Sequence, residues 1–241
     1  KSCPGIDRIV THDEPQPTGF DVHAPLMSLP YLLDTDLESI PNDVPYLYAP
    51  DDPHLPEDVQ TRLSNAPGLK VGLVWTPGLL AENARKRYCP LAHFEPVLEV
   101  PGVSFFSLYK GERVEELAPY RERVFDVGSH CTDFADTAWA IAQLDLVITV
   151  DTAVAHLAGA MGRPTWVLLP FVPDWRWLLE REDSPWYPTA RLFRQPYRGA
   201  WAPVLEQVAA SLHQAREASG RSGLSHHEHS PTRDIHGEHP R

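Results

Sequence analysis

Residues 144–170, LDLVITVDTAVAHLAGAMGRPTWVLLP, constrain the fold more than any other part of the chain. Residues 144–150 form a nearly continuous apolar run rich in β-branched side chains, which is typical of a parallel strand buried on both faces. Asp151 and Thr152 interrupt the run and are good helix N-cap residues. Apolar side chains then recur at helical spacing up to Gly162, and residues 165–169 predict a second buried strand. The spacing predicts a right-handed βαβ unit.

The turn between this strand and its helix is a candidate anion site. The first turn of a helix has free N–H groups, and together with the helix dipole these attract negative charge. The compact sequence Asp151-Thr152-Ala153 would let a phosphate reach the amides of Ala153 and Val154, and the Thr152 hydroxyl would add a donor. From the spacing alone, a simple capping role for Asp151 and Thr152 is the commoner explanation.

Strand and helix patterns alternate from residue 69 to residue 218. Strands are predicted over residues 69–75, 103–108, 124–127, 144–150, 165–169 and 191–194. Helices are predicted over residues 57–63, 91–100, 113–120, 133–144, 153–161, 175–182 and 201–218. This alternation predicts an α/β fold with an open parallel sheet and helices on both faces. Ligands bind such sheets beyond the strand carboxyl ends, so we expect Thr76, Lys110, Asp151 and Pro170 to meet on one rim.

The two ends of the chain differ from this core. Residues 6–10 and 20–22 predict only short strands, and residues 41–67 are rich in Pro and Asp, which is typical of a linker. Residues 1–67 hold too few apolar side chains to close a core of their own. Residues 219–241 are polar and rich in histidine, without apolar periodicity, which predicts a disordered tail.

Charge and composition exclude several classes of protein. A formal net charge of −12 over 241 residues argues against nonspecific binding to nucleic acid or to an anionic membrane surface. We find no signal peptide and no apolar run long enough to span a membrane. Cys3, Cys89 and Cys131 are odd in number and lack metal-binding spacing, which favours reduced thiols in a cytoplasmic protein.

Several phrases, in their order along the chain, resemble a known family. They are VGLVW, RKRYCPL, PGVSFFSLYKG, DVGSHCTDFADTAWAIAQLDLVITVDTAVAHLAGAMGRPTWVLLP and PDWRWLLEREDSPWYPTARLFRQP. They look like the glycosyltransferase-like domain of bacterial tetratricopeptide-repeat proteins. That domain is similar to glycosyltransferase family 9, the heptosyltransferases, and more distantly to O-linked N-acetylglucosamine transferases. The resemblance covers residues 6–212 and is most specific over residues 71–196.

The resemblance implies a GT-B architecture, in which two Rossmann-like domains face each other across a cleft. The C-terminal domain of such a protein holds a nucleotide-sugar donor. Residues 68–218 would be that domain, and residues 1–67 would be a remnant of the N-terminal domain with the interdomain linker. Residues 219–241 would follow as the tail.

The resemblance also implies site residues. In the family, the turn matching Asp151, Thr152 and Ala153 holds the donor diphosphate, with the aspartate near the sugar. Lys110 and Arg87 match basic residues that meet phosphate, although Lys110 could also be a solvated turn lysine and Arg87 is equally well explained as part of a charged run. His156 matches the histidine of the family's D-T-x-x-x-H pattern, where donor contact and simple packing are equally plausible.

One loop departs from the family. After the first strand its members read tryptophan, a small residue, glycine, asparagine and proline, whereas this chain reads Trp75-Thr76-Pro77-Gly78-Leu79-Leu80. The asparagine is missing and the order of Gly and Pro is changed. Because the loop faces the donor in the family, the change bears on donor affinity and on activity.

Glycosyl transfer also needs a base that takes the proton of the acceptor hydroxyl. His23 is the candidate base within residues 1–67, although a linker histidine is the commoner role. Helix amides and basic side chains would stabilise the departing diphosphate, so we expect no metal and no cofactor.

The expected function is that of an inverting glycosyltransferase that binds a nucleotide-sugar donor and transfers the sugar to a glycan or protein acceptor. As residues 1–241 it should transfer poorly, because most of the acceptor half is missing, and its exposed remnant should favour self-association. Two alternatives stay open: a noncatalytic interaction module that keeps the fold, and a nucleotide-sugar epimerase that shares the GT-B plan. Binding of a nucleotide-sugar would distinguish a glycosyltransferase from the noncatalytic module. Donor turnover without acceptor would identify the epimerase.

Overall fold

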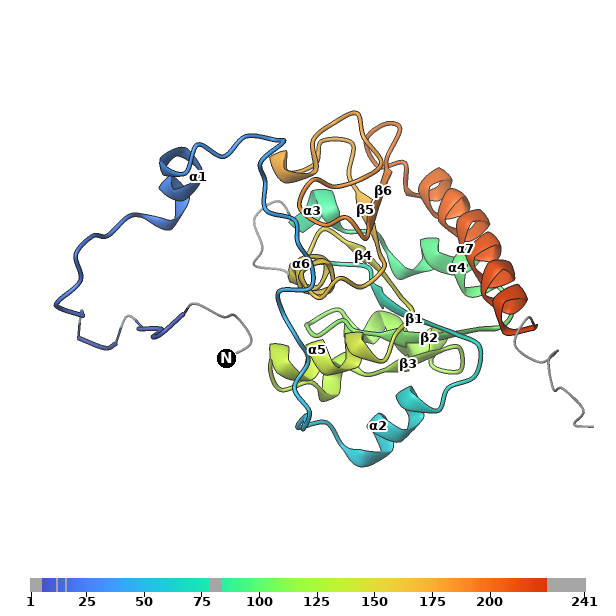
Figure 1. Ribbon diagram of the computed structural model, residues 1–241. Helices are drawn as coiled ribbons and strands as arrows, with labels where there is room; N and C mark the ends of the chain where they lie inside the picture. Colours follow the sequence, from blue (N-terminus) through green and yellow to red (C-terminus); the bar gives the residue numbers. More distant parts are fainter. Residues whose placement is uncertain (1–5, 12, 16, 79–83, 225–241) are drawn as a thin grey trace, which may run out of the picture.

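The computed structural model describes residues 6–11, 13–15, 17–78 and 84–224, with the side chains of residues 219–224 excepted. A parallel sheet forms its centre (Figure 1). The strands are β1 Leu69–Val74, β2 Val103–Ser107, β3 Val124–Asp126, β4 Leu146–Val150, β5 Thr165–Leu169 and β6 Ala190–Arg194. Their order is β3-β2-β1-β4-β5-β6, and every pairing is parallel. The predicted α/β fold is confirmed, and the sheet is consistent with a Rossmann-like GT-B domain.

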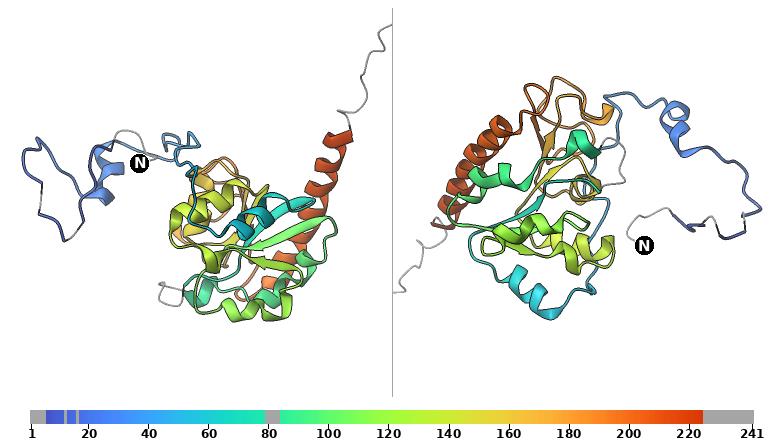
Figure 2. Two further views of the ribbon diagram at one scale, coloured as in Figure 1. Left: turned by 90° about the horizontal axis from the view of Figure 1, so that it is seen from below. Right: turned by 180° about the vertical axis from the view of Figure 1, so that it is seen from behind.

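Helices cover both faces of the sheet. α4 Glu95–Leu98 packs with α7 Trp201–Leu224 on one face, whereas α5 Phe134–Ala142 and α6 Ala153–Ala160 pack together on the other (Figures 1 and 2). β4 lies between these layers and is buried at all of its residues. This double burial explains why its sequence is an unbroken apolar run.

Short helical segments complete the connections. They are α3 Ala84–Arg87, η2 Leu91–Phe94, η3 Val114–Tyr120, η4 Gly128–His130 and η5 Trp175–Trp177. No helix in the described part of the chain is both long enough and apolar enough to cross a membrane. α7 continues to Leu224, six residues past its predicted end at residue 218. The rest of the predicted tail, residues 225–241, lies outside the described residues.

The sheet has one topological switch point, between β1 and β4. β1 pairs with β2 on one side and with β4 on the other, so the chain runs outward from the centre in opposite directions. The connections that leave β1 and β4 therefore diverge and open a crevice beyond the strand carboxyl ends. Thr76 follows β1 and Asp151 follows β4 at this crevice.

The helix predicted over residues 175–182 is wrong beyond residue 177. Only η5 forms, and Leu178 has a left-handed backbone with φ of 55°. The guanidinium of Arg194, on β6, donates to the carbonyls of Trp177, Leu178 and Arg181. A side chain from the sheet thus satisfies the carbonyls of this loop, and no further helical turn is needed to pair them.

The two short strands predicted near the N-terminus are also wrong. Within the described residues, 6–11 and 17–25 contain no strand, and the segment forms only η1 Leu26–Ser28 and α1 Leu29–Leu32. This part of the chain extends away from the sheet (Figure 1). A short segment without a neighbouring strand has no partner for its backbone groups and does not form a sheet.

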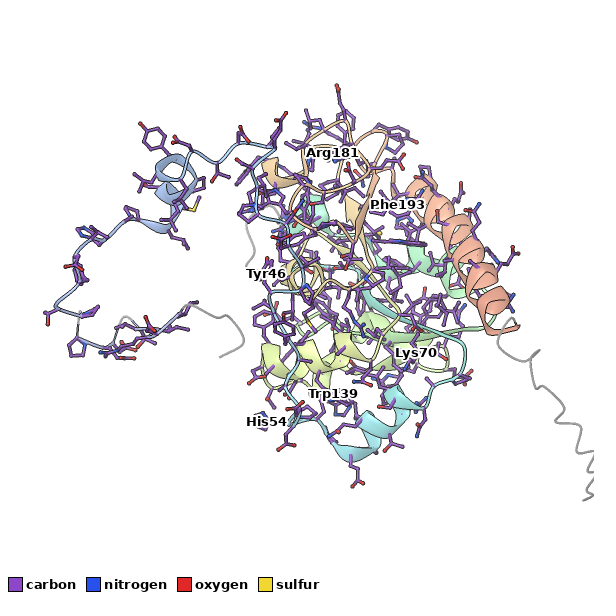
Figure 3. The ribbon with its side chains drawn as sticks, in the orientation of Figure 1. Tyr46, His54, Lys70, Trp139, Arg181 and Phe193 are labelled. Atoms are coloured by element: carbon purple, nitrogen blue, oxygen red, sulfur yellow. The ribbon has the colours of Figure 1, made fainter. Side chains whose placement is uncertain are left out.

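Residues 40–67 pack against the sheet domain more closely than the composition of a linker suggests. The N–H groups of Tyr46 and Leu47 donate to the carbonyl of Ala160, at the end of α6. α2 Glu57–Ser64 then buries Val59 and Leu63 in the main core. Figure 3 shows Tyr46 next to α6 and His54 near the start of α5, so this segment runs along both helices.

Candidate functional site

The N-terminus of α6 is not capped by a side chain. Thr152 is the N-cap residue, with an extended backbone at φ −143° and ψ 172°, yet its side chain makes no capping hydrogen bond. Among the described residues, the amides of Ala153 and Val154 have no hydrogen-bond partner. The capping role that spacing favoured for Asp151 and Thr152 is therefore absent, and these amides remain able to bind an anion.

The Thr152 hydroxyl contacts Thr149 instead. Thr149 Oγ1 lies 2.7 Å from the Val150 carbonyl, to which it donates, and 3.1 Å from Thr152 Oγ1. Because Thr149 has a single hydroxyl proton, Thr152 must be the donor in the second contact. A phosphate at this turn would therefore be held first by the backbone amides, and Thr152 would donate only after rotating its proton outward.

Two cavities flank this helix terminus and share Arg87, Thr152 and Ala153. The larger has a volume of about 910 Å³ and extends toward the loop between β5 and β6. The smaller has a volume of about 620 Å³ and extends toward β1 and β2. Of the four residues expected on one rim, Asp151 and Pro170 line the larger cavity, and Thr76 and Lys110 line the smaller.

Asp151 lies between Arg87 and His156 on the wall of the larger cavity and is 6% exposed. Arg87 Nη1 is 2.8 Å from the Asp151 carbonyl oxygen, to which it donates, and 3.6 Å from Asp151 Oδ2. His156 Nε2 lies 3.8 Å from Asp151 Oδ1. The arrangement fixes the Arg87 guanidinium beside the α6 N-terminus, where it adds positive charge to the site.

His156 is held in place from two sides. Its Nδ1 lies 3.0 Å from the Tyr187 hydroxyl, and its ring stacks on Trp177 at a centroid distance of 5.3 Å. Burial lowers the pKa of His156 below its ordinary value, and this outweighs the opposite effect of the Asp151 carboxylate. At neutral pH His156 is therefore an uncharged imidazole with Nε2 on the Asp151 side of the larger cavity.

The smaller cavity is lined by aromatic and aliphatic side chains together with the charged residues Arg87, Lys110 and Asp133 and several threonines. Lys110 Nζ donates to the Cys131 carbonyl, which holds the ammonium at the cavity wall. Thr76 is buried and its hydroxyl donates to the Pro77 carbonyl at 3.0 Å, so this hydroxyl is engaged within the loop. Leu79 and Leu80, in the loop that departs from the family, lie outside the described residues.

Sequence reasoning missed several lining residues. Phe134, at the start of α5, is 59% exposed and lines the smaller cavity, as does Tyr109. Tyr187 and Arg176 line the larger cavity from the irregular loop after β5. Such loops have no hydrophobic periodicity. The sequence signal that could have identified these lining residues is the polar and aromatic composition of residues 174–187.

His23 is not brought to the site. It is exposed, its ring contacts Phe20 at 5.8 Å, and it lines neither cavity. A role for His23 as a base stays a prediction.

A group of potential metal ligands lies at the start of α5, and one of its members, Asp133, also lines the smaller cavity. The ligand atoms of His54, Asp133 and Asp136 lie within 4.8 Å of one another. Asp136 is buried, and its oxygens accept from the His54 amide at 2.7 Å and from the Thr132 amide and hydroxyl at 2.7 and 2.6 Å. Asp133 caps α5. These contacts explain the cluster as an attachment of residues 40–67 to the domain.

Comparisons with known proteins bear on the same region of the chain. Residues 104–168 match the model of glycosyltransferase family 9 (heptosyltransferase). The matched segment begins in β2 and ends in β5, so it includes Lys110, the α6 N-terminus and His156. Thr76, Arg87 and His23 lie outside it.

The chain is also similar to protein FlbA of Caulobacter vibrioides (strain ATCC 19089 / CIP 103742 / CB 15). The two are 36% identical over 155 residues, which is 61% of this chain and 25% of FlbA. The chain thus spans about a quarter of the length of this curated relative. Residues 104–168 are thus similar to glycosyltransferase family 9, and the parallel sheet that contains them is consistent with the fold of such a domain.

Proposed function

We propose that this chain is the nucleotide-sugar-binding half of a GT-B glycosyltransferase. The observation that carries the proposal is the uncapped N-terminus of α6, which lies at the switch point of the sheet between two cavities. Such a terminus is suited to binding a phosphate, and a ligand with one group on either side of a diphosphate would fit the two flanking cavities.

The chemistry of each cavity suggests which end of the donor it holds. The rings of Tyr109 and Phe134 give the smaller cavity flat apolar surfaces, which suit a nucleoside base, and Leu108 adds an aliphatic surface. Asp151, His156 and Arg176 give the larger cavity polar groups, which suit sugar hydroxyls. Arg87 and Lys110 would then stand on either side of the diphosphate.

The same groups account for the departure of the nucleotide. Negative charge builds on the diphosphate as the bond to the sugar breaks, and preorganised amides and cations stabilise it most at that point. The acceptor hydroxyl would attack from the opposite side of the sugar, which gives inversion. Its proton would pass to a base in the facing half of the protein, to which His23 and residues 1–67 would belong.

A noncatalytic module that keeps the fold is the second candidate. The loop at Trp75-Thr76-Pro77-Gly78 favours it, because this loop borders the smaller cavity and lacks the asparagine of the resembling family. This candidate predicts no binding of nucleoside diphosphates or their sugars. An epimerase would bind the donor and convert it without acceptor.

Calorimetric titration with a panel of nucleoside diphosphates, their sugars and the bare nucleosides tests the proposal. We expect one diphosphate to bind clearly more tightly than its nucleoside. In Lys110→Ala the diphosphate should lose more affinity than the nucleoside, and the difference should shrink as salt rises, because an exposed ammonium is screened. Thr61→Val, on the exposed face of α2, serves as the control. Equal losses for both ligands would place Lys110 in folding or base binding instead.

A further inference from the structure

A second hollow lies behind α3, next to the larger cavity. It has a volume of about 410 Å³ and shares Lys86, Pro170 and Val172 with the larger cavity. We call it the basic groove; its side chains come from α3, from the loop after β5 and from the turn that leads into α7. It is lined by Arg85, Lys86, Tyr88, Pro90, His93, Pro170, Phe171, Val172, Gln195, Arg198, Gly199 and Trp201.

The charge of the basic groove is opposite to that of the chain. Arg85, Lys86 and Arg198 are exposed on its walls and form no ion pair with any residue that the structure describes. No described carboxylate lines the groove, although the chain as a whole has a net charge of −12. Three cations without an ion-pair partner in the described part of an acidic protein make a local site for negative charge.

Gln195 adds a fixed donor to these cations. Its residue is 5% exposed, and its Oε1 accepts from the amides of Phe171 and Gly199 at 3.2 and 3.1 Å. These two bonds determine the orientation of the carboxamide. Its Nε2 has no partner among the described residues and does not belong to the fully buried unpaired atoms, so this N–H₂ group is accessible at the groove wall. A carboxylate in the groove could accept a hydrogen bond from it.

The remaining lining is apolar. Phe171 and Val172 are 49% and 51% exposed at the groove, and the rings of Tyr88 and Trp201 line it. A uniformly charged polyanion would gain little from these surfaces and would be repelled by the acidic remainder of the protein. A ligand with separate carboxylates and aliphatic groups matches both kinds of surface. Arg and aromatic side chains are also the residues enriched where proteins bind polypeptides.

We propose that the basic groove binds an acidic polypeptide segment through carboxylates that meet Arg85, Arg198 and Gln195 Nε2. If the proposed function holds, the segment belongs to the acceptor, because the groove opens beside the sugar cavity. Only this link to the acceptor rests on the proposed function. Binding of the segment itself needs no nucleotide.

Fluorescence anisotropy with a short labelled peptide of alternating Glu and Leu tests the proposal, with no nucleotide present. We expect saturable binding, weakened about tenfold in Arg85→Ala/Arg198→Ala by the loss of two exposed ion pairs. The control Arg62→Ala/Arg121→Ala removes the same charge from two exposed arginines at the far side of the sheet and should bind as wild type. A labelled oligonucleotide and a labelled peptide of alternating Lys and Leu should bind far more weakly.

Gln195→Glu gives a second test that preserves the fold. The new carboxylate still accepts from Phe171 and Gly199 but replaces the donor with a negative oxygen, so peptide binding should fall further than in Gln195→Ala. Equal peptide binding by the arginine double variant and its control would overturn the proposal, as would oligonucleotide binding equal to that of the peptide. Nucleoside diphosphate titration of the same variants reports the donor site independently, because Arg85, Arg198 and Gln195 line neither donor cavity.

Discussion

His156 shows how a single side chain is set by its surroundings. Burial against Trp177 and Tyr187 disfavours its charged form, whereas Asp151 favours it. The net effect is a pKa below the ordinary value. In the unfolded chain the same histidine takes up a proton more readily, so its contribution to stability is present above about pH 6.5 and is lost as pH falls through the lowered pKa.

This balance predicts that the pKa of His156 shifts in opposite directions in two variants. Asp151→Asn removes the charge that raises the pKa of His156 and should lower that pKa further. Arg176→Ala removes a charge that lowers it and should raise it. Titration of the His156 ring signals by NMR measures both, with Arg62→Ala as a control of equal charge. A rise in Asp151→Asn would mean that the carboxylate does not act on His156.

At the scale of elements, Asp136 joins residues 40–67 to α5. Its buried carboxylate accepts hydrogen bonds from His54 and Thr132. Burial raises the pKa of Asp136, but the hydrogen bonds from Thr132 and from the His54 amide outweigh it and lower the pKa below its ordinary value. The lowered pKa stabilises the fold at neutral pH, and this stabilisation is lost as pH falls below about 3.8 toward the folded-state pKa.

Asp136→Asn should therefore destabilise the domain by about 1–3 kcal/mol at pH 7, because the neutral amide has one accepting oxygen where the carboxylate uses both of its oxygens. The difference from wild type should shrink in acid. Urea unfolding at several pH values measures it. Asp58→Asn, on the first turn of the exposed side of α2, is the control and should change stability far less. An equal loss at pH 7 and in acid would exclude the charge of Asp136 as the cause.

The strands and the main helices could be predicted because their residues are buried on a regular period. The predicted strands at residues 144–150 and 165–169 contain β4 and β5, and the positions of Lys110 and Asp151 after parallel strands predicted that both lie at one edge of the sheet. The loop after β5 could not be predicted, since its shape depends on Arg194 reaching back from β6. The exposure of Phe134 could not be predicted either. Helical spacing shows which residues share a face of the helix, but it does not show whether that face lines a cavity.

At the scale of the whole molecule, the proposed donor site and the candidate base His23 lie in different parts of the structure. The sheet and both cavities are formed by residues 69–201, whereas the segment with His23 extends away from them (Figure 1). Holding two substrates in reacting geometry contributes on the order of 7–11 kcal/mol to catalysis. Residues 1–241 should therefore bind donor and transfer little or no sugar. Robust turnover by this chain would contradict the account and would make His23 the leading base.

The extended segment also predicts self-association. Leu26, Met27, Tyr31 and Leu32 are 79%, 81%, 84% and 57% exposed around α1. Clustered apolar side chains on a surface favour contact with a second copy. Light scattering during size exclusion should show a mass that rises with concentration, and Leu26→Ser/Tyr31→Ser should reduce this rise. A mass that stays monomeric at all concentrations would exclude such contacts.

The central claim is that the free amides of α6 hold a diphosphate, and Ala153→Pro tests it most directly. Proline is well tolerated at the first position of a helix, and the extended backbone of Thr152 suits a residue before proline, so the variant should fold normally while it lacks one amide donor. Calorimetric titration with the preferred nucleoside diphosphate should show a loss of about 1.5–3 kcal/mol, a larger loss than in Thr152→Val, with the affinity for the bare nucleoside unchanged. An unchanged diphosphate affinity in folded Ala153→Pro would contradict the claim.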